Sequence, residues 1–130
     1  MKYIKPFESI EFSEKLDPIV PNTFVYHKSN PHFRDEISKM GLIPKGKSDT
    51  WMSDTKINGE VIFATNSDNP DDWFDSTWDD DVYKIDTRGL GNRWFKDPNF
   101  PNKYQHIITP DPIPNSAIEL IYKGSGESTL

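Results

Sequence analysis

Three histidines occur in the sequence, and His27 is the one whose surroundings most favour chemistry. It follows Phe24-Val25-Tyr26, a β-branched and aromatic run that predicts a strand ending at the histidine. Imidazole is easily poised near neutral pH, and it can donate a hydrogen bond from one nitrogen while accepting at the other. His27 is therefore a candidate binding or acid–base residue. The alternative is a structural histidine that hydrogen-bonds a neighbouring backbone group.

The residues after His27 predict a short helix that would fix its position. Asn30 is a suitable N-cap, and Pro31 suits the first helical position because its φ is fixed and it has no N–H to leave unpaired. Gly41 suits the residue after the helix, where a left-handed conformation is common. Apolar residues recur at helical spacing and predict one buried helical face: Phe33, Ile37 and Met40.

Acidic residues gather at two places that could be taken for a metal site. Asp71 and Asp72 follow Asn69-Pro70, where they fall in the first turn of a second predicted helix and favour its macrodipole. The run 79–81 follows that helix as a turn exposed to solvent. A closed cation site needs several converging ligands. Since capping and solvation explain these acids, we expect no metal.

Composition narrows the class of protein. The chain has 130 residues, no cysteine and a net charge of −6, which predicts one domain without disulfides and disfavours non-specific binding to nucleic acid or anionic membranes. No apolar run approaches the ~20 residues of a membrane span, and the N-terminus lacks the apolar core of a signal peptide. We expect a soluble, cytoplasmic protein. Residues 1–8 resemble the starts of proteins from large tailed bacteriophages, which would imply the cytoplasm of a bacterial host.

The predicted elements define an α+β fold with a small, split, mostly antiparallel sheet and two short helices. The helices are expected over 30–41 and 70–78. The strands are expected over 24–26, 60–65, 82–86, 104–109 and 117–122. We expect an N-terminal arm over 1–22, a single domain over 23–123 and a disordered tail over 124–130.

The order of the motifs resembles the ADP-ribosyltransferase superfold, including the branch near the RNA 2′-phosphotransferases. In that family a strand ends in Tyr-His, a helix ends in Gly-Leu-x-Pro, and a strand of the type Val-Tyr-Phe-Ala-Thr follows. A later strand ends in Ile-Asp, and the pattern closes with the strand of the catalytic position and an Ile-Pro motif. The matching segments here are Val25–His27, Met40–Pro44, Val61–Thr65, Val82–Asp86, Tyr104–Ile108 and Ile113–Ile118.

The resemblance implies NAD as a co-substrate, lying in the cleft between two half-sheets. His27 matches the histidine that bonds the adenosine-side ribose, and the backbone beside it, at Lys28 and Ser29, would hold the nicotinamide amide. Ile62 stands where the family has a stacking tyrosine, with Phe63 beside it as a substitute.

Two further positions belong to the implied site. Gln105 stands at or near the family's catalytic glutamate. Because neighbouring side chains of a strand point to opposite faces, only one of Gln105 and His106 can enter the cleft, and both stay open. Trp51, in the polar loop 45–59, either contacts the ligand or covers an edge of the core.

The departures from the family pattern leave two functions open. Lys28 replaces a small residue, and the Gln105 amide cannot offer a carboxylate to a developing cation. The first function is an NAD-dependent transferase that moves ADP-ribose to a protein or nucleic-acid acceptor; few arginines disfavour the phosphotransferase version. The second is a catalytically inactive binding module or small accessory protein.

Overall fold

A single antiparallel sheet forms the framework of the computed structural model, which describes residues 16–44, 46–47, 60–67, 69, 79–97 and 105–125. Its seven strands follow the order β5-β6-β3-β1-β4-β7, with β2 pairing β3 off this path. The strands are β1 Phe24–Ser29, β2 Gly46–Lys47, β3 Glu60–Thr65, β4 Asp81–Asp86, β5 Phe95–Lys96, β6 His106–Thr109 and β7 Ile118–Tyr122. The helical segments are η1 Pro31–Phe33, α2 Arg34–Met40 and η2 Asn115–Ala117. The predicted α+β class with an antiparallel sheet is confirmed, while the predicted helix over 70–78 lies outside the described residues.

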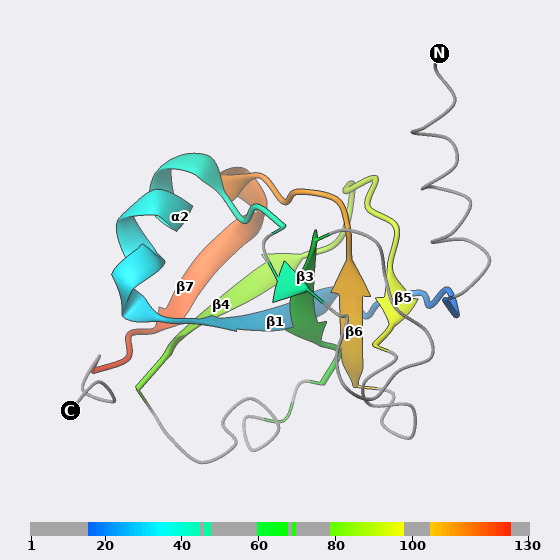
Figure 1. Cartoon of the computed structure of the whole chain (residues 1–130), viewed down its shortest axis with the longest axis horizontal. Coiled ribbons are helices and arrows are strands. Elements are labelled where there is room, and N and C mark those ends of the chain that lie inside the picture. Colours follow the sequence, from blue (N-terminus) through cyan, green and yellow to red (C-terminus); the bar gives the residue numbers. More distant parts are fainter. Residues whose placement is uncertain are drawn as a thin grey trace.

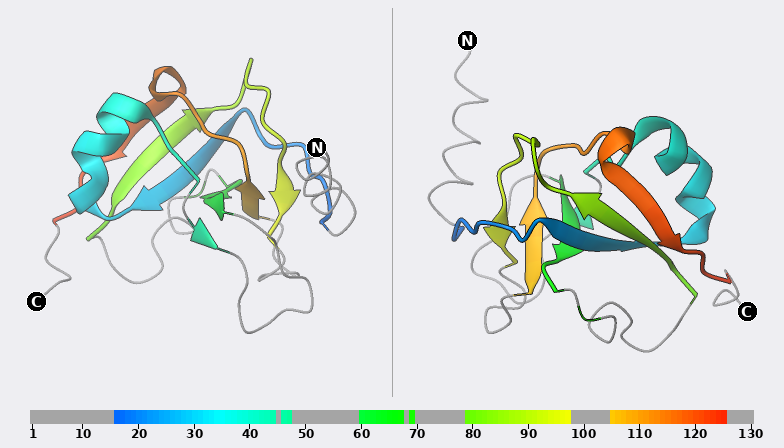
Figure 2. Two further views of the ribbon diagram at one scale, coloured as in Figure 1. Left: turned by 45° about the horizontal axis from the view of Figure 1, so that its top comes forward. Right: turned by 180° about the vertical axis from the view of Figure 1, so that it is seen from behind.

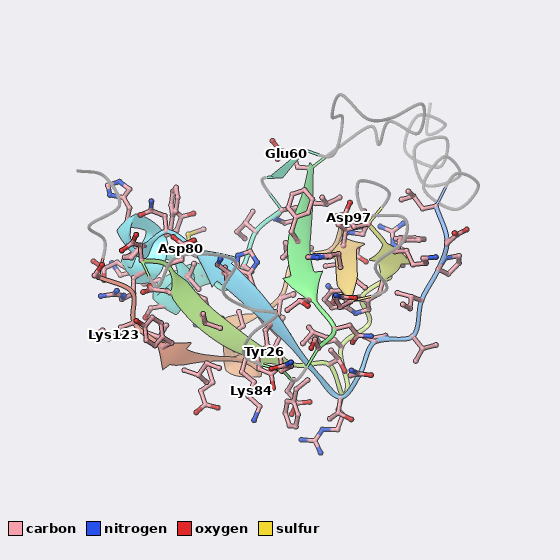
Figure 3. All side chains as sticks on the ribbon, turned by 90° about the horizontal axis from the view of Figure 1, so that it is seen from below. Tyr26, Glu60, Asp80, Lys84, Asp97 and Lys123 are labelled. Atoms are coloured by element: carbon pink, nitrogen blue, oxygen red, sulfur yellow. The ribbon has the colours of Figure 1, made fainter. Side chains whose placement is uncertain are left out.

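The sheet divides where β1 meets β3. β1 pairs with β4 from Phe24 to Ser29, but its register with β3 is limited to Tyr26 opposite Thr65 among the described residues. Figures 1 and 2 show β1, β4 and β7 running side by side, with β3, β6 and β5 crossing them steeply. Figure 3 shows β1 and β3 close together near Tyr26 and diverging toward Glu60. The two groups are therefore half-sheets joined at one point.

The two faces of the sheet carry different apolar clusters. The larger cluster lies on the face covered by α2 and includes Val25, Ile62, Tyr83 and Ile107. A smaller cluster lies on the opposite face of the β3–β6–β5 half and includes Val61 and other residues: Leu16, Phe95 and Ile108. Because side chains alternate along a strand, cluster membership shows which face each strand residue occupies.

The predicted cap of the helix after β1 is confirmed, but its buried face is narrower than predicted. The Asn30 side chain accepts a hydrogen bond from the backbone N–H of His32 at 2.8 Å. Ile37 is 7% exposed, whereas Phe33 is 39% and Met40 60% exposed. The expectation of a three-residue apolar face is wrong because the helix, only seven residues long, packs on the sheet through Ile37 alone.

Gly41 ends α2 as predicted and joins it closely to a distant segment. Its φ is +78°, and its N–H donates to the carbonyl of Ile37 at 2.8 Å. The next residue, Leu42, exchanges two backbone hydrogen bonds with Ile113, at 2.9 and 3.0 Å. The Asn115 side chain then donates to the carbonyl of Ser38 at 3.0 Å. The C-terminal end of α2 is thus fixed to the segment before β7.

The other end of α2 is fixed by a half-buried ion pair. Arg34 donates to both carboxylate oxygens of Asp81, at 2.8 and 2.7 Å, and the Asp81 side chain is fully buried. The N–H of Gly124 donates to the same carboxylate at 2.8 Å, and the Ser125 hydroxyl donates to Asp79 at 2.8 Å. The expectation that residue 81 belongs to a solvated turn is wrong, because this aspartate opens β4 and neutralises Arg34.

The N-terminal segment that the structure describes packs along β5. Leu16 is 5% exposed, and Ile19 donates its N–H to the carbonyl of Trp94 at 3.0 Å. Trp94 and Phe95 lie outside every predicted strand, yet both are 5% exposed and Phe95 opens β5. The first fifteen residues of the predicted arm lie outside the described part of the chain.

Candidate functional site

A cavity of about 280 Å³ lies where β1 and β3 diverge, between the two half-sheets and α2. Five residues predicted for the site line it: His27, Lys28, Ser29, Ile62 and Phe63. Side chains of η1 and α2 close another side of the cavity, among them Phe33 and Glu36. Gln105 is not among the described residues that line it, and Trp51 lies outside the described residues.

His27 lies inside β1, two residues before its end, rather than at the predicted end of the strand. Its Nδ1 lies 2.6 Å from the carbonyl oxygen of Phe63. A carbonyl can only accept, so Nδ1 carries the proton and the other ring nitrogen, Nε2, is left as an acceptor. Burial lowers the pKa of His27, although the Phe63 carbonyl and the charge of Asp80 oppose that shift. The ring is therefore neutral at pH 7.

The register of β1 with β4 decides where the backbone of Lys28 points. Thr87 donates its N–H to the carbonyl of Thr23 at 2.9 Å, so these residues form a hydrogen-bonded pair of the antiparallel ladder. Hydrogen-bonded and non-hydrogen-bonded pairs alternate. The backbone groups of His27 therefore point toward β4, and those of Lys28 point the other way, into the gap that opens beside β3.

The His27 ring occupies the place of a ladder bond. Continuing the register from Tyr26 opposite Thr65 would bring Lys28 opposite Phe63. Instead the imidazole Nδ1 donates a hydrogen bond to the carbonyl of Phe63 at 2.6 Å. The backbone N–H and C=O of Lys28 consequently form an adjacent donor and acceptor facing the cavity. This pair can recognise a group that both accepts and donates, such as a primary carboxamide.

Side-chain alternation sorts the remaining predicted residues between the two faces. The partners across β3 and β6 are Thr65 with His106 and Ala64 with Ile107. Ala64 and Ile107 belong to the larger cluster, on the same face as the His27 side chain. His106, the first residue of β6, lies on the opposite face, and Gln105 comes just before the strand. Strand alternation therefore places the His106 side chain away from the His27 face, and a role for Gln105 stays a prediction.

The same alternation separates Ile62 from Phe63. Ile62 belongs to the larger cluster on the His27 face and is 3% exposed. Phe63 packs against the smaller cluster on the opposite face, while its backbone contributes to the cavity through the bond to His27. The only side chain of this pair on the face of the histidine is therefore aliphatic. Phe33, from η1, is an aromatic residue that lines the same cavity.

Gln105 immediately precedes β6, and β3 separates β6 from β1, the strand that carries His27. The carbonyl of Gln105 accepts a hydrogen bond from the N–H of Asn66 at 2.6 Å, just beyond the point where β1 and β3 pair. Two strand spacings and two residue steps separate the backbones of Gln105 and His27 by roughly 12 Å. At that separation only an extended ligand would contact both.

A second cavity, of about 470 Å³, lies on the other side of α2, between the helix and β7. Its lining includes Arg34, Asp35 and Ser38 from the helix and Tyr83 from β4. Burial and the charge of Asp81 raise the pKa of Tyr83 to about 12, so the phenol is neutral. No residue predicted for the site lines this cavity, and the sequence pattern gave no signal for it.

Neither metal-binding geometry nor similarity to known proteins adds an assignment for this site. Within the described ranges, no group of three or more His, Asp or Glu side chains is arranged to hold a metal ion. No helix in the part of the chain that the structure describes has the length and apolar character needed to cross a membrane. No protein-family model matches the chain, and no curated protein matches it.

Proposed function

We propose that this chain binds NAD between its half-sheets and transfers the ADP-ribose part to a protein or nucleic-acid acceptor, as the resemblance to ADP-ribosyltransferases implies. One observation carries the proposal. The His27 ring bonds the Phe63 carbonyl at the split of the sheet, at 2.6 Å, and so leaves both Nε2 and the Lys28 backbone facing one cavity. Ring and backbone together offer the contacts that NAD requires.

The chemistry of these groups fits NAD. A ribose hydroxyl can donate to Nε2 of His27, and the nicotinamide amide can donate to the C=O of Lys28 while accepting from its N–H. Ile62 and Phe33 supply apolar walls for a flat ring. The cavity, about 280 Å³, is near the lower end of the ~300–1,000 Å³ typical of ligand sites. It would hold one end of the dinucleotide, with the rest extending along the cleft.

The transfer breaks the bond between ribose C1′ and the nicotinamide nitrogen, and the electron pair leaves with nicotinamide. The acceptor's nucleophilic atom then bonds to C1′ and releases its proton to solvent. Positive charge develops on the ribose in between, so a nearby negative or dipolar oxygen lowers the barrier. The Gln105 side chain can offer only an amide dipole, which stabilises this charge less than a carboxylate would.

A catalytically inactive NAD-binding module is the second candidate. It is favoured by the neutral Gln105, which does not line the cavity, and by the aliphatic Ile62 in place of a stacking aromatic. Such a module would keep the His27 and Lys28 contacts and lack turnover.

Calorimetric titration with NAD, followed by mass spectrometry for released nicotinamide, tests the proposal. His27→Ala removes the ribose contact and leaves the Phe63 carbonyl unpaired, a loss of ~1–3 kcal/mol, so we expect NAD affinity to fall by about fivefold to 150-fold. His106→Ala, on the opposite face, is the matched control and should bind NAD like the parent. A parent protein that binds no NAD would refute both candidates, and binding without nicotinamide release would favour the inactive module.

A further inference from the structure

The larger of the two cavities, about 470 Å³, lies between α2 and β7. Figures 1 and 2 show the helix beside this strand, which is the last in the order of the sheet. Both ends of the helix are held, one by the ion pair between Arg34 and Asp81 and the other by the Asn115 side chain. Because these contacts fix the helix over the sheet, the cavity is formed before any ligand binds, as is usual for small-molecule sites.

The floor of this cavity is apolar. Ile37 and Tyr83 are 7% and 3% exposed, while Ile118 and Leu120 are partly buried and pack against the larger cluster. Such a floor can remove the apolar body of a small molecule from water. Each methylene group that it buries should tighten binding about fourfold.

Hydrogen-bond donors lie at the end of the cavity that holds the ion pair. Arg34 donates to Asp81 through Nε and Nη2, and no described residue accepts a hydrogen bond from its Nη1. The Tyr83 hydroxyl lies 3.5 Å from the Asp81 carboxylate, farther than the ~2.5–3.0 Å of an ordinary O–H···O bond. Burial and the charge of Asp81 raise the pKa of Tyr83 to about 12, so the phenol keeps its proton. Both groups can therefore donate to an acceptor in the cavity.

The charges at this end favour a ligand with one negative charge. Asp81 balances the charge of Arg34, and Lys123 lines the cavity with an ammonium that has no partner among the described residues. Asp35 also lines the cavity, but it is exposed and stands two residues from Ile37, about 200° around the helix from the side that packs on the sheet. A monoanion matches the single unpaired cation, whereas a phosphate dianion would exceed it.

We propose that the cavity between α2 and β7 binds a small monocarboxylate with an apolar body, the carboxylate beside Arg34 and Lys123 and the body over the apolar floor. A carboxylate has two oxygens with about four lone-pair sites, enough to accept from Nη1 of Arg34, the Tyr83 hydroxyl and the Lys123 ammonium. The inference does not rest on the proposed binding of NAD, because the His27 cavity lies on the other side of α2.

Hexanoate is the probe, titrated into the ¹⁵N-labelled full chain near pH 7 and 0.1 M salt and followed by NMR chemical shifts. Backbone signals of residues 34–38 and 118–123 should shift and saturate. Hexanamide keeps the chain but lacks the charge and should bind at least about fivefold more weakly, because charge-assisted hydrogen bonds are roughly twice as strong as neutral ones. Acetate lacks most of the chain and should bind at least about tenfold more weakly.

Two lysines provide a matched pair of variants. Lys123→Gln removes the cation from the cavity and should weaken hexanoate binding at least about twofold, while hexanamide binding stays within about 1.5-fold of the parent. Lys39→Gln removes the same charge from an exposed position of α2 that is not among the described residues lining either cavity. It should leave hexanoate binding within about 1.5-fold of the parent. Arg34 is kept in both variants, because its loss would leave the buried Asp81 carboxylate unpaired.

Several results would overturn the proposal. Shifts confined to residues 27–29 and 61–63 would place hexanoate in the His27 cavity instead. Equal affinities for hexanoate and hexanamide, or no saturable shift at residues 34–38 and 118–123, would show that no carboxylate site exists there. Equal losses in Lys39→Gln and Lys123→Gln would also refute it, because they would show a general effect of protein charge.

Discussion

Two glycines with positive φ allow a matched test of how α2 is held over the cleft. Gly41 has φ +78° and Gly89 has φ +81°, so alanine is strained at both. At Gly89 an added Cβ would meet no atom within 4 Å, whereas at Gly41 it would overlap the backbone carbonyl oxygen of Ile113 and lie 2.8 Å from the backbone nitrogen of Asn115. Gly41→Ala therefore adds a backbone clash to the strain that Gly89→Ala also carries.

The expected magnitudes follow from these contacts. A left-handed conformation costs alanine ~1–2 kcal/mol, and the loss of unfolded-state entropy returns ~0.4–1 kcal/mol, so Gly89→Ala should lower the free energy of unfolding by about 1 kcal/mol. At Gly41, ψ is −165°, a region that is essentially confined to glycine and costs ~1–3 kcal/mol. Relieving the clash must also separate Leu42 from Ile113, whose two hydrogen bonds contribute ~0.5–1.5 kcal/mol each. Gly41→Ala should thus lower the free energy of unfolding by about 3 kcal/mol or more.

Urea denaturation at 25 °C, followed by tryptophan fluorescence, measures both variants against the parent. We expect the free energies of unfolding of the two variants to differ by about 2 kcal/mol. Equal losses would refute the reasoning, because they would show that the contact between residues 41 and 113–115 does not constrain the helix. Since Gly41 also lines the cavity, Gly41→Ala should weaken NAD binding as well.

Three further predictions concern the cap, the ion pair and the chemistry. Asn30→Ala should lower the free energy of unfolding by ~1 kcal/mol in urea titrations, because the bond to the His32 N–H is lost. Burial alone would raise the pKa of Asp81, but the Arg34 and Gly124 hydrogen bonds lower it overall. Its stabilisation is therefore present above the unfolded pKa of ~3.9 and is lost as pH falls through the lower, folded pKa. Parent and Asp81→Asn should thus differ in urea midpoint at pH 7, and the difference should shrink as the pH is lowered below ~3.9. Gln105→Ala should leave NAD affinity near the parental value but reduce nicotinamide release, and Gln105→Glu should raise release; unchanged release in both would remove Gln105 from the site.

Local sequence signals predicted the elements better than their junctions. Apolar and polar residues do not alternate regularly over Glu60–Thr65, which is typical of a buried strand rather than a half-exposed one. The strand β3 has the predicted bounds. The cap at Asn30 and the end at Gly41 rest on backbone geometry that one residue decides, and both predictions are confirmed. Asp81 was misjudged because its partner, Arg34, stands 47 positions earlier in the sequence, and no local pattern reports such a pair.

The candidate site required the register of three strands. Alternation alone could state that neighbouring strand residues face opposite ways, but only the pairing of β3 with β6 shows that His106 lies on the face opposite His27. The sequence likewise placed Glu36 on the helix without indicating its direction. Which side of α2 faces the cleft depends on Ile37, the only residue of α2 that is buried, and on the two anchored ends of the helix.

The structural and functional interpretations of His27, opposed in the sequence, are compatible in the fold. The hydrogen bond from Nδ1 to Phe63 is the structural role: it satisfies a carbonyl that the β1–β3 ladder would otherwise have paired. That same bond fixes the tautomer and leaves Nε2 as an acceptor. Because the ring replaces a hydrogen bond of the β1–β3 ladder, the backbone of Lys28 is directed into the gap between the half-sheets. The loss of His27 should therefore change the shape of the cleft together with its contacts, and a weaker affinity for NAD in His27→Ala would combine both effects.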